Sequence, residues 1–378
     1  MKELNLQEIR GQLDIIDAQI VELFEKRMQL CADVAEFKIG TGKAVFDKER
    51  EQQKIASVTG MAHGEFNKKA VDELFSQIMT ISRRLQYQLL EQHGKAMEMG
   101  FTQVDHLPTE GIRVVYQGLE GAYSHAAALS YFGEEVNAYH VPMFEDAMKA
   151  VQDGEADYAV IPIENSSAGA VIDTYDLMIK YDNTIVAEIL LPINHALLGV
   201  PGACIEDIKT VYSHPQSLMQ CSEYLNSNRQ WRQISMPNNA VAAKKVTDDQ
   251  DKTQAAVAGV TAGRLYGLNV LKECINHNKD NTTRFVVLCK KPVFRESASK
   301  VSICFELPHH SGTLYNMLGN FIYNGVNMVM IESRPILGRN WEYRFFVDIE
   351  GKLSDASIQN SLKGISEEAS YFRILGNY

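Results

Sequence analysis

The chain has 378 residues, a length that predicts two or three domains, each with its own hydrophobic core. Its formal net charge of -11, with no compensating basic tract, argues against nucleic-acid binding as its main task. The N-terminal residues lack an apolar signal core, and no run reaches about 18 uninterrupted apolar residues, so we expect neither secretion nor a membrane span.

Cysteine spacing adds information about the cellular compartment. None of the six cysteines lies in a Cys-x-x-Cys or Cys/His zinc pattern. Reduced thiols in a cytoplasmic protein are therefore expected, and no metal site is predicted.

Residues 6–39 predict one long amphipathic helix with cations on its apolar side. A cation facing a packed interior needs an acidic partner or a bound anion. Snorkelling, or pairing with local glutamates, explains the same cations equally well from this helix alone. The apolar positions step by four and three residues, a heptad pattern that favours a helical partner and that Arg27 interrupts: Ile9, Leu13, Ile16, Ile20, Leu23, Arg27, Leu30, Val34 and Phe37.

The helical rise limits which cations can share a ligand. Arg27 and Lys38 are separated by about 16 Å along a continuous helix, so two long side chains could converge on one ligand between them. Arg10 lies roughly 42 Å from Lys38 by the same rise. If Arg10 also binds ligand, it reaches the site of a partner in a two-fold dimer.

Two further helices are expected before residue 92. Asp47 is a plausible N-cap for the second helix, on which Asp47, Arg50 and Glu51 share one face. The third helix covers about 67–91 and places Ser82 and Gln86 one turn apart. Each pair alone fits an ordinary solvated helix face, whereas the three helices together form a more specific constellation.

Residues 1–92 resemble the all-helical chorismate mutases. The family pattern has Arg, Arg and Lys on the first helix, Asp-x-x-Arg-Glu on the second and Ser-x-x-x-Gln on the third, and no expected position is missing. The resemblance implies a three-helix fold, an interlocked dimer and these catalytic residues: Arg10, Arg27, Lys38, Asp47, Arg50, Glu51, Ser82 and Gln86.

Rearrangement of chorismate to prephenate is pericyclic and needs no nucleophile, proton transfer or cofactor. The site must hold a compact conformer and stabilise negative charge on the breaking ether oxygen. The resemblance makes the arginines clamps for the two carboxylates. Lys38 and Gln86 would donate to the ether oxygen, and Glu51 would accept from the ring hydroxyl or orient its neighbours.

Residues 93–110 lose the helical period and are expected to form a linker. Short apolar runs then alternate with helical segments, which indicates an α/β domain with a largely parallel or mixed sheet. The expected strands are 112–116, 158–161, 184–190, 196–200, 210–212, 255–260 and 284–288.

Four polar loops accompany these strands: 118–125, 163–169, 213–216 and 281–285. The first is not a Gly-x-Gly-x-x-Gly fingerprint, which weakens a dinucleotide-binding hypothesis. There is no Gly-x-Ser-x-Gly elbow to support a hydrolase. Turn formation and helix capping would account for any one loop by itself.

Together these loops resemble prephenate dehydratase, because Gly-Ala-Tyr-Ser, Glu-Asn-Ser-Ser, Ser-His-Pro-Gln and Thr-Arg-Phe occur in family order. The resemblance implies a two-lobed fold like the periplasmic binding proteins over residues 111–291, with the site in the cleft. It makes Thr283 the hydrogen-bond donor or relay that assists hydroxide departure from prephenate, while CO₂ leaves and phenylpyruvate forms. Arg284 would hold a carboxylate, and Phe285 would close the pocket or pack behind it. The implied substrate-binding residues are Tyr123, Ser124, Glu164, Asn165, Ser166, Ser213, Gln216, Arg284 and Phe285.

Residues 299–378 show the order βαββαβ, typical of a compact α+β ferredoxin-like unit. The segment resembles the regulatory ACT domain of these dehydratases, which implies that phenylalanine binds where two such domains meet. Thr313 stands where the family usually has Ala, which puts effector affinity in question; a domain that only dimerises is the alternative. The implied effector-binding residues are Gly312, Thr313, Leu314, Glu332, Ser333, Arg334 and Pro335.

The sequence thus predicts a bifunctional chorismate mutase and prephenate dehydratase, homodimeric or larger, with phenylalanine as feedback effector and without nucleic-acid or membrane partners. Two alternatives remain: a dehydratase that uses arogenate, and an amino-acid-sensing binding protein without catalysis. Fusion to a prephenate dehydrogenase is disfavoured, because the dinucleotide fingerprint is missing.

Overall fold

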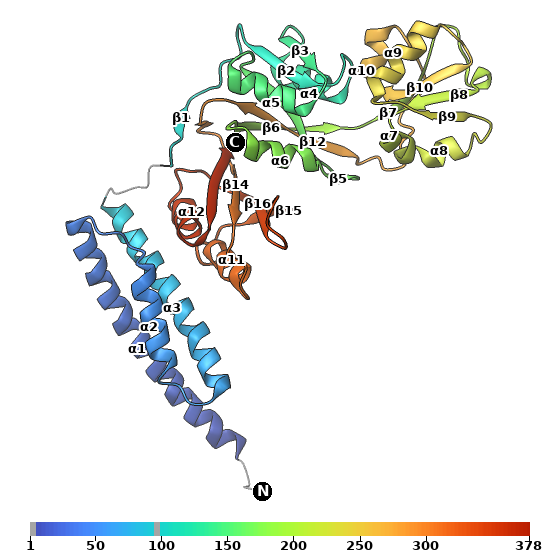
Figure 1. Cartoon of the computed structure of the whole chain (residues 1–378). Helices are drawn as coiled ribbons and strands as arrows, with labels where there is room; N and C mark the ends of the chain where they lie inside the picture. The colour runs from blue at the N-terminus through green and yellow to red at the C-terminus, as the bar shows by residue number, and fades with distance from the viewer. Residues whose placement is uncertain (1–4, 94–98) are drawn as a thin grey trace. The chain divides into compact units, whose positions relative to one another are not determined.

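The computed structural model describes residues 5–93 and 99–378, so residues 94–98 of the predicted linker lie outside the described part. Figure 1 shows the chain with its elements labelled. Residue contacts divide it into two compact units. The first comprises Met1–Met99, Phe305–Met328 and Gly351–Phe372, and the second comprises Gly100–Cys304, Val329–Glu350 and Arg373–Tyr378.

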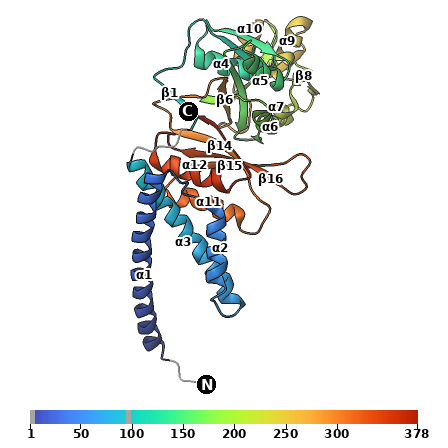
Figure 2. The same ribbon diagram turned by 60° about the vertical axis from the view of Figure 1, so that its left-hand side comes forward.

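The first unit is helical. Its helices are α1 (Leu6–Thr41), α2 (Lys48–Thr59), α3 (Glu65–Gln92), α11 (Thr313–Tyr323) and α12 (Ala356–Glu368). Helix α3 packs against α1 and α2, as Figure 2 shows, and α12 packs against both α3 and α11. The expected long first helix is confirmed: the Asn5 side chain caps its N-terminus, and Gly42 follows it in the left-handed conformation with φ 72°.

The second unit combines helices with two large sheets. Its helices are α4 (Tyr123–Phe132), α5 (Phe144–Asp153), α6 (Ile172–Lys180), α7 (Pro215–Gln220), α8 (Ser222–Asn226), α9 (Asn239–Asp249) and α10 (Val260–Tyr266). The strands up to residue 295 are β1 (Thr102–Val104), β2 (Arg113–Gln117), β3 (Asn137–Val141), β4 (Tyr158–Asn165), β5 (Gly169–Ala170), β6 (Thr184–Pro192), β7 (His195–Gly199), β8 (Thr210–Ser213), β9 (Arg232–Ser235), β10 (Gln254–Gly259), β11 (Asn269–Lys272), β12 (Thr282–Cys289) and β13 (Val293–Arg295).

Four later strands are β14 (Lys300–Glu306), β15 (Met328–Pro335), β16 (Tyr343–Glu350) and β17 (Tyr371–Asn377). The larger sheet has the order β15-β16-β14-β17-β6-β12-β4-β2-β3, with β5 paired to β4, and the second has the order β11-β7-β10-β8-β9. Both sheets are mixed: β2 runs parallel to β3 and β4, whereas β12 runs antiparallel to β4 and β6. The predicted mixed α/β sheet is confirmed.

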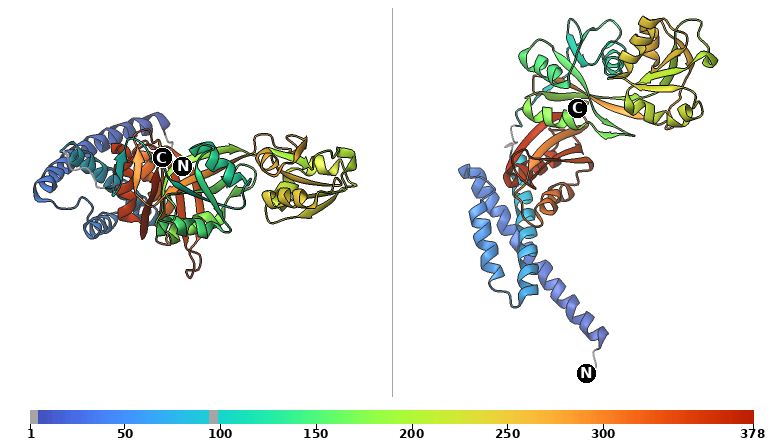
Figure 3. Two further views of the ribbon diagram at one scale, coloured as in Figure 1. Left: turned by 90° about the horizontal axis from the view of Figure 1, so that it is seen from above. Right: turned by 45° about the vertical axis from the view of Figure 1, so that its right-hand side comes forward.

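The second unit has two lobes up to β12, one on each sheet (Figure 3). The chain passes between the sheets twice, after β6 and again before β12. The two crossings run side by side, because Ile193 N–H donates to Asn281 O at 2.7 Å and Ile275 N–H donates to His195 O at 2.9 Å. The crossings therefore bring residues near 194 and near 280 together.

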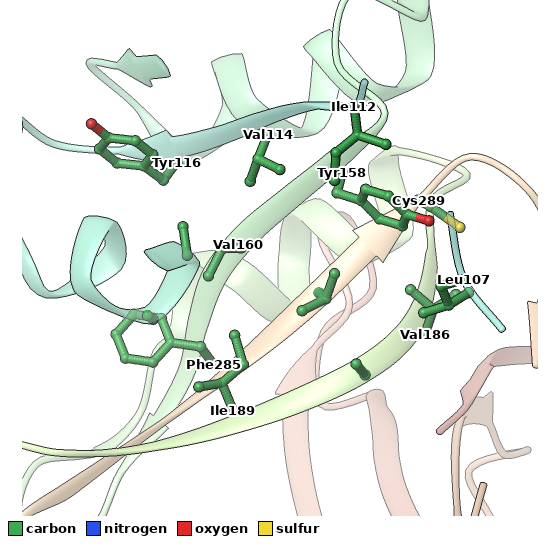
Figure 4. Close-up of a cluster of buried hydrophobic side chains, with 14 residues drawn as sticks. Leu107, Ile112, Val114, Tyr116, Tyr158, Val160, Val186, Ile189, Phe285 and Cys289 are labelled. Atoms are coloured by element: carbon green, nitrogen blue, oxygen red, sulfur yellow. The ribbon is translucent and has the colours of Figure 1, made fainter. Parts of the chain in front are cut away.

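An apolar cluster holds the first lobe together (Figure 4). Strand β12 contributes Phe285 and Val287, β4 contributes Val160, and β2 contributes Val114 and Tyr116; all five are at most 2% exposed. A strand paired on both sides and covered on both faces needs such an apolar run. Phe285 therefore packs into this core, one of the two positions expected for it.

Six short strands of the described part had no counterpart among the predicted ones, namely β1, β3, β5, β9, β11 and β13. Strand β1 lies within the predicted linker and pairs in parallel with β13. Strands of two to five residues carry too few side chains for a period-2 pattern to emerge. Among the described residues, no helix is both long and apolar enough to cross a bilayer.

Candidate active sites

The helices of the first unit bring together four of the residues predicted for the mutase. Arg27 Nη1 of α1 donates to Ser82 Oγ of α3 at 2.5 Å. Lys38 Nζ donates to Gln86 Oε1 at 3.1 Å and to Val45 O at 2.7 Å. Ser82 and Gln86 lie one turn apart on α3, so their spacing matches two cations on the facing helix.

Burial shifts the pKa values of two charged side chains at this cluster. Burial lowers the pKa of Lys38 from its ordinary value, and the nearby carboxylates of Asp47 and Glu51 oppose the shift. Burial also raises the pKa of Glu51, opposed mainly by the adjacent guanidinium of Arg83. The arrangement offers a cationic donor and an amide on one side and a carboxylate on the other.

Sequence reasoning missed Arg83. Its guanidinium binds Glu51 Oε2 and Glu368 Oε1, each at 2.5 Å, and lies over the Phe46 ring, 4.8 Å from its centroid. Glu51, Arg83 and Glu368 line a cavity of about 270 Å³. The only signal in the sequence was that Arg83 directly follows Ser82. One of its two acidic partners, Glu368, comes from α12, 285 residues further along the chain.

Of the other predicted mutase residues, Asp47 and Glu51 lie close enough to act on the charge of Lys38, whereas Arg10 lies far from this cluster. Asp47 Oδ1 accepts the Arg50 N–H at 3.0 Å and caps α2, as expected, and both side chains are exposed. Arg10 is exposed near the start of α1. It is 17 residues from Arg27, or roughly 26 Å along the helix. The expected separation of Arg10 from its own chain's cluster is confirmed.

The predicted dehydratase residues Asn165, Ser166 and Thr283 meet where β4 pairs with β12. Asn165 lies opposite Thr283 in the register, and its Nδ2 donates to Thr283 Oγ1 at 2.9 Å. Ser166 Oγ accepts the Thr282 N–H at 2.9 Å and donates to Asp280 O. The loop after β4 is therefore hydrogen-bonded to the segment that leads into β12.

Four other predicted dehydratase residues lie elsewhere in the two lobes. Tyr123 begins α4, with its hydroxyl 2.9 Å from His195 Nδ1, and Ser124 is buried beside it. Ser213 and Gln216 lie in the second lobe, at the end of β8 and in α7. The Ser213 hydroxyl donates to Val257 O at 2.6 Å, so it helps to hold that lobe together.

Arg284 binds the protein's own carboxylates. It follows Thr283 on β12, and consecutive strand residues project to opposite faces. Its guanidinium meets Glu188 at 2.9 Å, Asp348 at 2.6 Å and the Tyr378 hydroxyl at 2.6 Å, with Glu164 at 3.8 Å. Arg284 would have to exchange some of these partners to hold a substrate carboxylate, and that role stays a prediction.

The residues predicted for effector binding form two separate segments. Gly312 precedes α11 with φ 82°, a conformation that favours glycine, and Leu314 lies in the first turn of that helix. The Thr313 hydroxyl lies within hydrogen-bond distance of Pro308 O and His310 O, so the threonine holds the loop before α11 in place.

The second segment lies at the end of β15. Arg334 forms a two-pronged ion pair with Asp176 of α6, at 2.7 and 3.2 Å. Residues of β15 alternate between exposed and half-buried, with Glu332 and Arg334 on the half-buried side and Ser333 and Pro335 on the exposed side. The strand is thus tied to a helix of the first lobe.

Two family models match the chain. The model described as "Chorismate mutase type II" matches residues 9–87, and the model described as "Prephenate dehydratase" matches residues 114–293. These ranges contain the Lys38–Gln86 and Asn165–Thr283 contacts, respectively.

Some known proteins resemble about two thirds of the chain, and others resemble nearly all of it. An "Arogenate dehydratase/prephenate dehydratase 1, chloroplastic" of Arabidopsis thaliana is 40% identical over 285 residues, covering 71% of this chain and 72% of the relative. A crystal structure of prephenate dehydratase from Arthrobacter aurescens in complex with L-Phe matches with TM-score 0.65 and 31% identity, covering 71% of this chain and 89% of that one.

A "Bifunctional chorismate mutase/prephenate dehydratase" of Neisseria gonorrhoeae is 33% identical over 374 residues, covering 98% of this chain and 95% of the relative. The likeness extends over both enzyme regions and the C-terminal strands and helices. The chain therefore belongs to the family of bifunctional chorismate mutase/prephenate dehydratases.

Proposed function

We propose that this chain rearranges chorismate to prephenate among α1, α2 and α3, and converts prephenate to phenylpyruvate beside Thr283. Membership of the family makes it an isomerase and a carbon–oxygen lyase of phenylalanine biosynthesis. The observation that carries the assignment of sites is the occurrence, in one chain, of the Lys38–Gln86 donor pair and the Asn165–Thr283 pair.

In the mutase site the cations do the chemical work. Arg27 holds a substrate carboxylate in place of its present contact with Ser82. Lys38 and Gln86 donate to the ether oxygen as negative charge builds on it, an interaction stronger in the transition state than in the ground state. The Gln86 amide must present Nε2 to that oxygen. Glu51 accepts from the ring hydroxyl.

The mutase site is completed by a second copy of the chain. The seam residues of α1, Arg27 excepted, are 37 to 65% exposed, far more apolar surface than a solvated helix normally presents: Ile9, Leu13, Ile16, Ile20, Leu23, Leu30, Val34 and Phe37. A two-fold dimer that buries this seam brings Arg10 to the partner's Arg27 and Lys38.

In the dehydratase site Thr283 donates a hydrogen bond to the departing hydroxyl of prephenate. Thr283 is 9% exposed, and Asn165 Nδ2 donates to its hydroxyl oxygen. Aromatisation supplies the driving force, so the site needs positioned donors more than a strong acid. Tyr123, Ser213 and Gln216, drawn from both lobes, contribute to substrate binding.

Phenylalanine acts as the feedback effector through the C-terminal residues. The strand order β17-β14-β16-β15, with helices after β14 and β16, is that of a ferredoxin-like unit and supports an ACT-type domain over 299–378. The Arthrobacter aurescens relative was crystallised with L-Phe. We assign the effector to a site between two such domains, at Gly312–Leu314 and Glu332–Pro335. All six cysteines are free, which supports a cytoplasmic setting.

Arogenate remains the second candidate substrate, because the Arabidopsis thaliana relative carries both activities in its name. Purified protein assayed with each compound distinguishes the two. Phenylpyruvate formed from prephenate supports our proposal, and phenylalanine formed from arogenate at a higher kcat/KM contradicts it.

Lys38→Ala should lower mutase kcat by about 100- to 1,000-fold, because it removes a donor aimed at developing charge. Initial rates of chorismate disappearance measure the effect. Lys26→Ala is the matched control, since Lys26 lies on the same helix and pairs with Glu22 in solvent. Unchanged mutase turnover in Lys38→Ala would remove this residue from the mechanism.

Arg10→Ala and Lys38→Ala should each be inactive as a mutase when pure, yet active when unfolded together and refolded as mixed dimers. In a mixed dimer one site combines an intact Lys38 with an intact Arg10 from the other chain, so about a quarter of all sites are restored. Recovery of mutase activity after mixing is the readout. Absence of recovery, with dimers shown by light scattering, contradicts the donation of Arg10.

Thr283→Ala should lower dehydratase kcat by about 100-fold or more, because no donor then assists hydroxide departure. Thr283→Ser keeps the hydroxyl and should retain dehydration. Mutase activity of the same preparations reports folding. Dehydration by Thr283→Ala at the wild-type rate would exclude this residue as the donor.

Asp176→Asn should raise the phenylalanine concentration needed for half-inhibition by about 5-fold or more, because it weakens the tie between Arg334 and α6. Dehydratase rates titrated with L-phenylalanine give this value. Asp173→Asn, one turn earlier on α6, is the control. Equal sensitivity in both variants would show that this ion pair does not transmit the effector signal.

A further inference from the structure

A buried histidine without a role in the proposed chemistry lies at the crossing between the two lobes. His195, the first residue of β7, is 1% exposed. Its Nδ1 lies 2.9 Å from the Tyr123 hydroxyl and its Nε2 lies 2.9 Å from Gln220 Oε1. Which nitrogen of such a ring carries a proton is set by the partners that the two nitrogens meet.

Polar side chains continue from Gln220 to the dehydratase site. Gln220 Oε1 also accepts from Asn281 Nδ2 at 3.1 Å, and Asn281 Oδ1 accepts from Asn165 Nδ2 at 2.8 Å. Asn165 then donates to Thr283 Oγ1. One chain of hydrogen bonds therefore leads from Tyr123, through both crossings, to the proposed donor.

The backbone sets the direction of the hydrogen bonds between Thr283 and His195. Asn165 Oδ1 accepts the N–H groups of Ser167 and Ala168, at 3.0 and 2.9 Å, so its Nδ2 must face Asn281 and Thr283. Asn281 must then present Oδ1 to Asn165 and Nδ2 to Gln220. Gln220 in turn presents Oε1 to His195.

This sequence requires a proton on His195 Nε2, because Gln220 Oε1 can only accept. The Tyr123 hydroxyl lies 2.9 Å from His195 Nδ1 and 3.2 Å from Asn194 O, and it donates to Nδ1 when the ring is neutral. Burial lowers the pKa of His195, opposed by its hydrogen bond to Gln220, and favours the neutral ring.

The direction of the hydrogen bond between Asn165 and Thr283 matters for the proposed dehydration. Thr283 Oγ1 accepts from Asn165, so the threonine does not donate its hydroxyl proton in that contact. The hydroxyl proton remains available for a substrate oxygen. A reversed amide at Asn165 would instead draw the Thr283 proton away from substrate.

We propose that His195 is a positioning residue for dehydration, whose Nε2–H fixes the orientation of Gln220 and Asn281 so that Asn165 donates to Thr283 and Thr283 donates to prephenate. The inference rests on the donor role of Thr283 proposed above. It adds His195, Gln220 and Asn281 to the residues on which dehydration depends.

His195→Phe removes the Nε2–H while retaining an aromatic ring, and His195→Gln keeps an N–H donor at a similar distance from the backbone. Dehydratase kcat should fall about 10- to 100-fold in His195→Phe, because misplacing a catalytic group by about 1 Å has such effects. KM should change much less, and His195→Gln should recover most of the lost kcat. Retained chorismate mutase activity of the same full-length chain excludes global unfolding.

Gln220→Met interrupts the chain at a second point without a change of size. It should reproduce the loss of dehydratase kcat, and the double variant His195→Phe/Gln220→Met should be no slower than either single variant, since both break one pathway. Additive losses would indicate two independent packing defects and overturn the proposal. This comparison remains decisive if His195→Phe folds poorly, because Gln220→Met can be judged alone against wild type.

Failure of the inference and failure of the proposed function give different results. Wild-type kcat in His195→Phe or Gln220→Met, with dehydration abolished in Thr283→Ala, overturns the positioning role alone. Dehydration retained in Thr283→Ala overturns the donor role of Thr283. A loss of kcat in His195→Phe that His195→Gln does not relieve also contradicts the proposal.

Discussion

Strand β12 is the constraint on which the second unit depends. It pairs with β4 on one side and β6 on the other, and consecutive residues on it project to opposite faces. Thr283 therefore meets the loop after β4, whereas Arg284 meets Glu188, Asp348 and Tyr378. The neighbouring residues Thr283 and Arg284 thus connect the proposed dehydratase site with residues of the C-terminal strands. Arg284 is costly to bury without these acceptors, so the contact also restrains where β12 can lie.

The first unit also buries cations, and its helices supply their acceptors. Cations on α1 and α3 face an interior, and each meets an acceptor there: Arg27 meets Ser82, Lys38 meets Gln86 and Val45 O, and Arg83 meets Glu51 and Glu368. Glu368 comes from α12, so a mutase helix and a C-terminal helix share one buried ion pair. The free energy of such a pair depends on both partners remaining, because an isolated buried charge is strongly destabilising.

The two proposed sites place different demands on the protein. The pericyclic reaction needs fixed charge, and rigid helices supply it. Dehydration needs a hydroxyl proton pointing in one direction, and a chain of amides anchored on backbone N–H groups supplies that direction. Both cases use preorganised donors, whose orientation is set before substrate arrives.

The sequence by itself determined the long helix, the seven main strands, the C-terminal order βαββαβ and the positions of the family motifs. These features depend on local periodicity and on residues within a few positions of each other. Only the tertiary structure decided that Arg83 pairs with Glu51 and Glu368, that Arg284 faces protein carboxylates, and that His195, Gln220 and Asn281 connect Tyr123 to Thr283. Those contacts join residues tens to hundreds of positions apart, and strand register and lobe crossings, which leave no periodic pattern, bring them together.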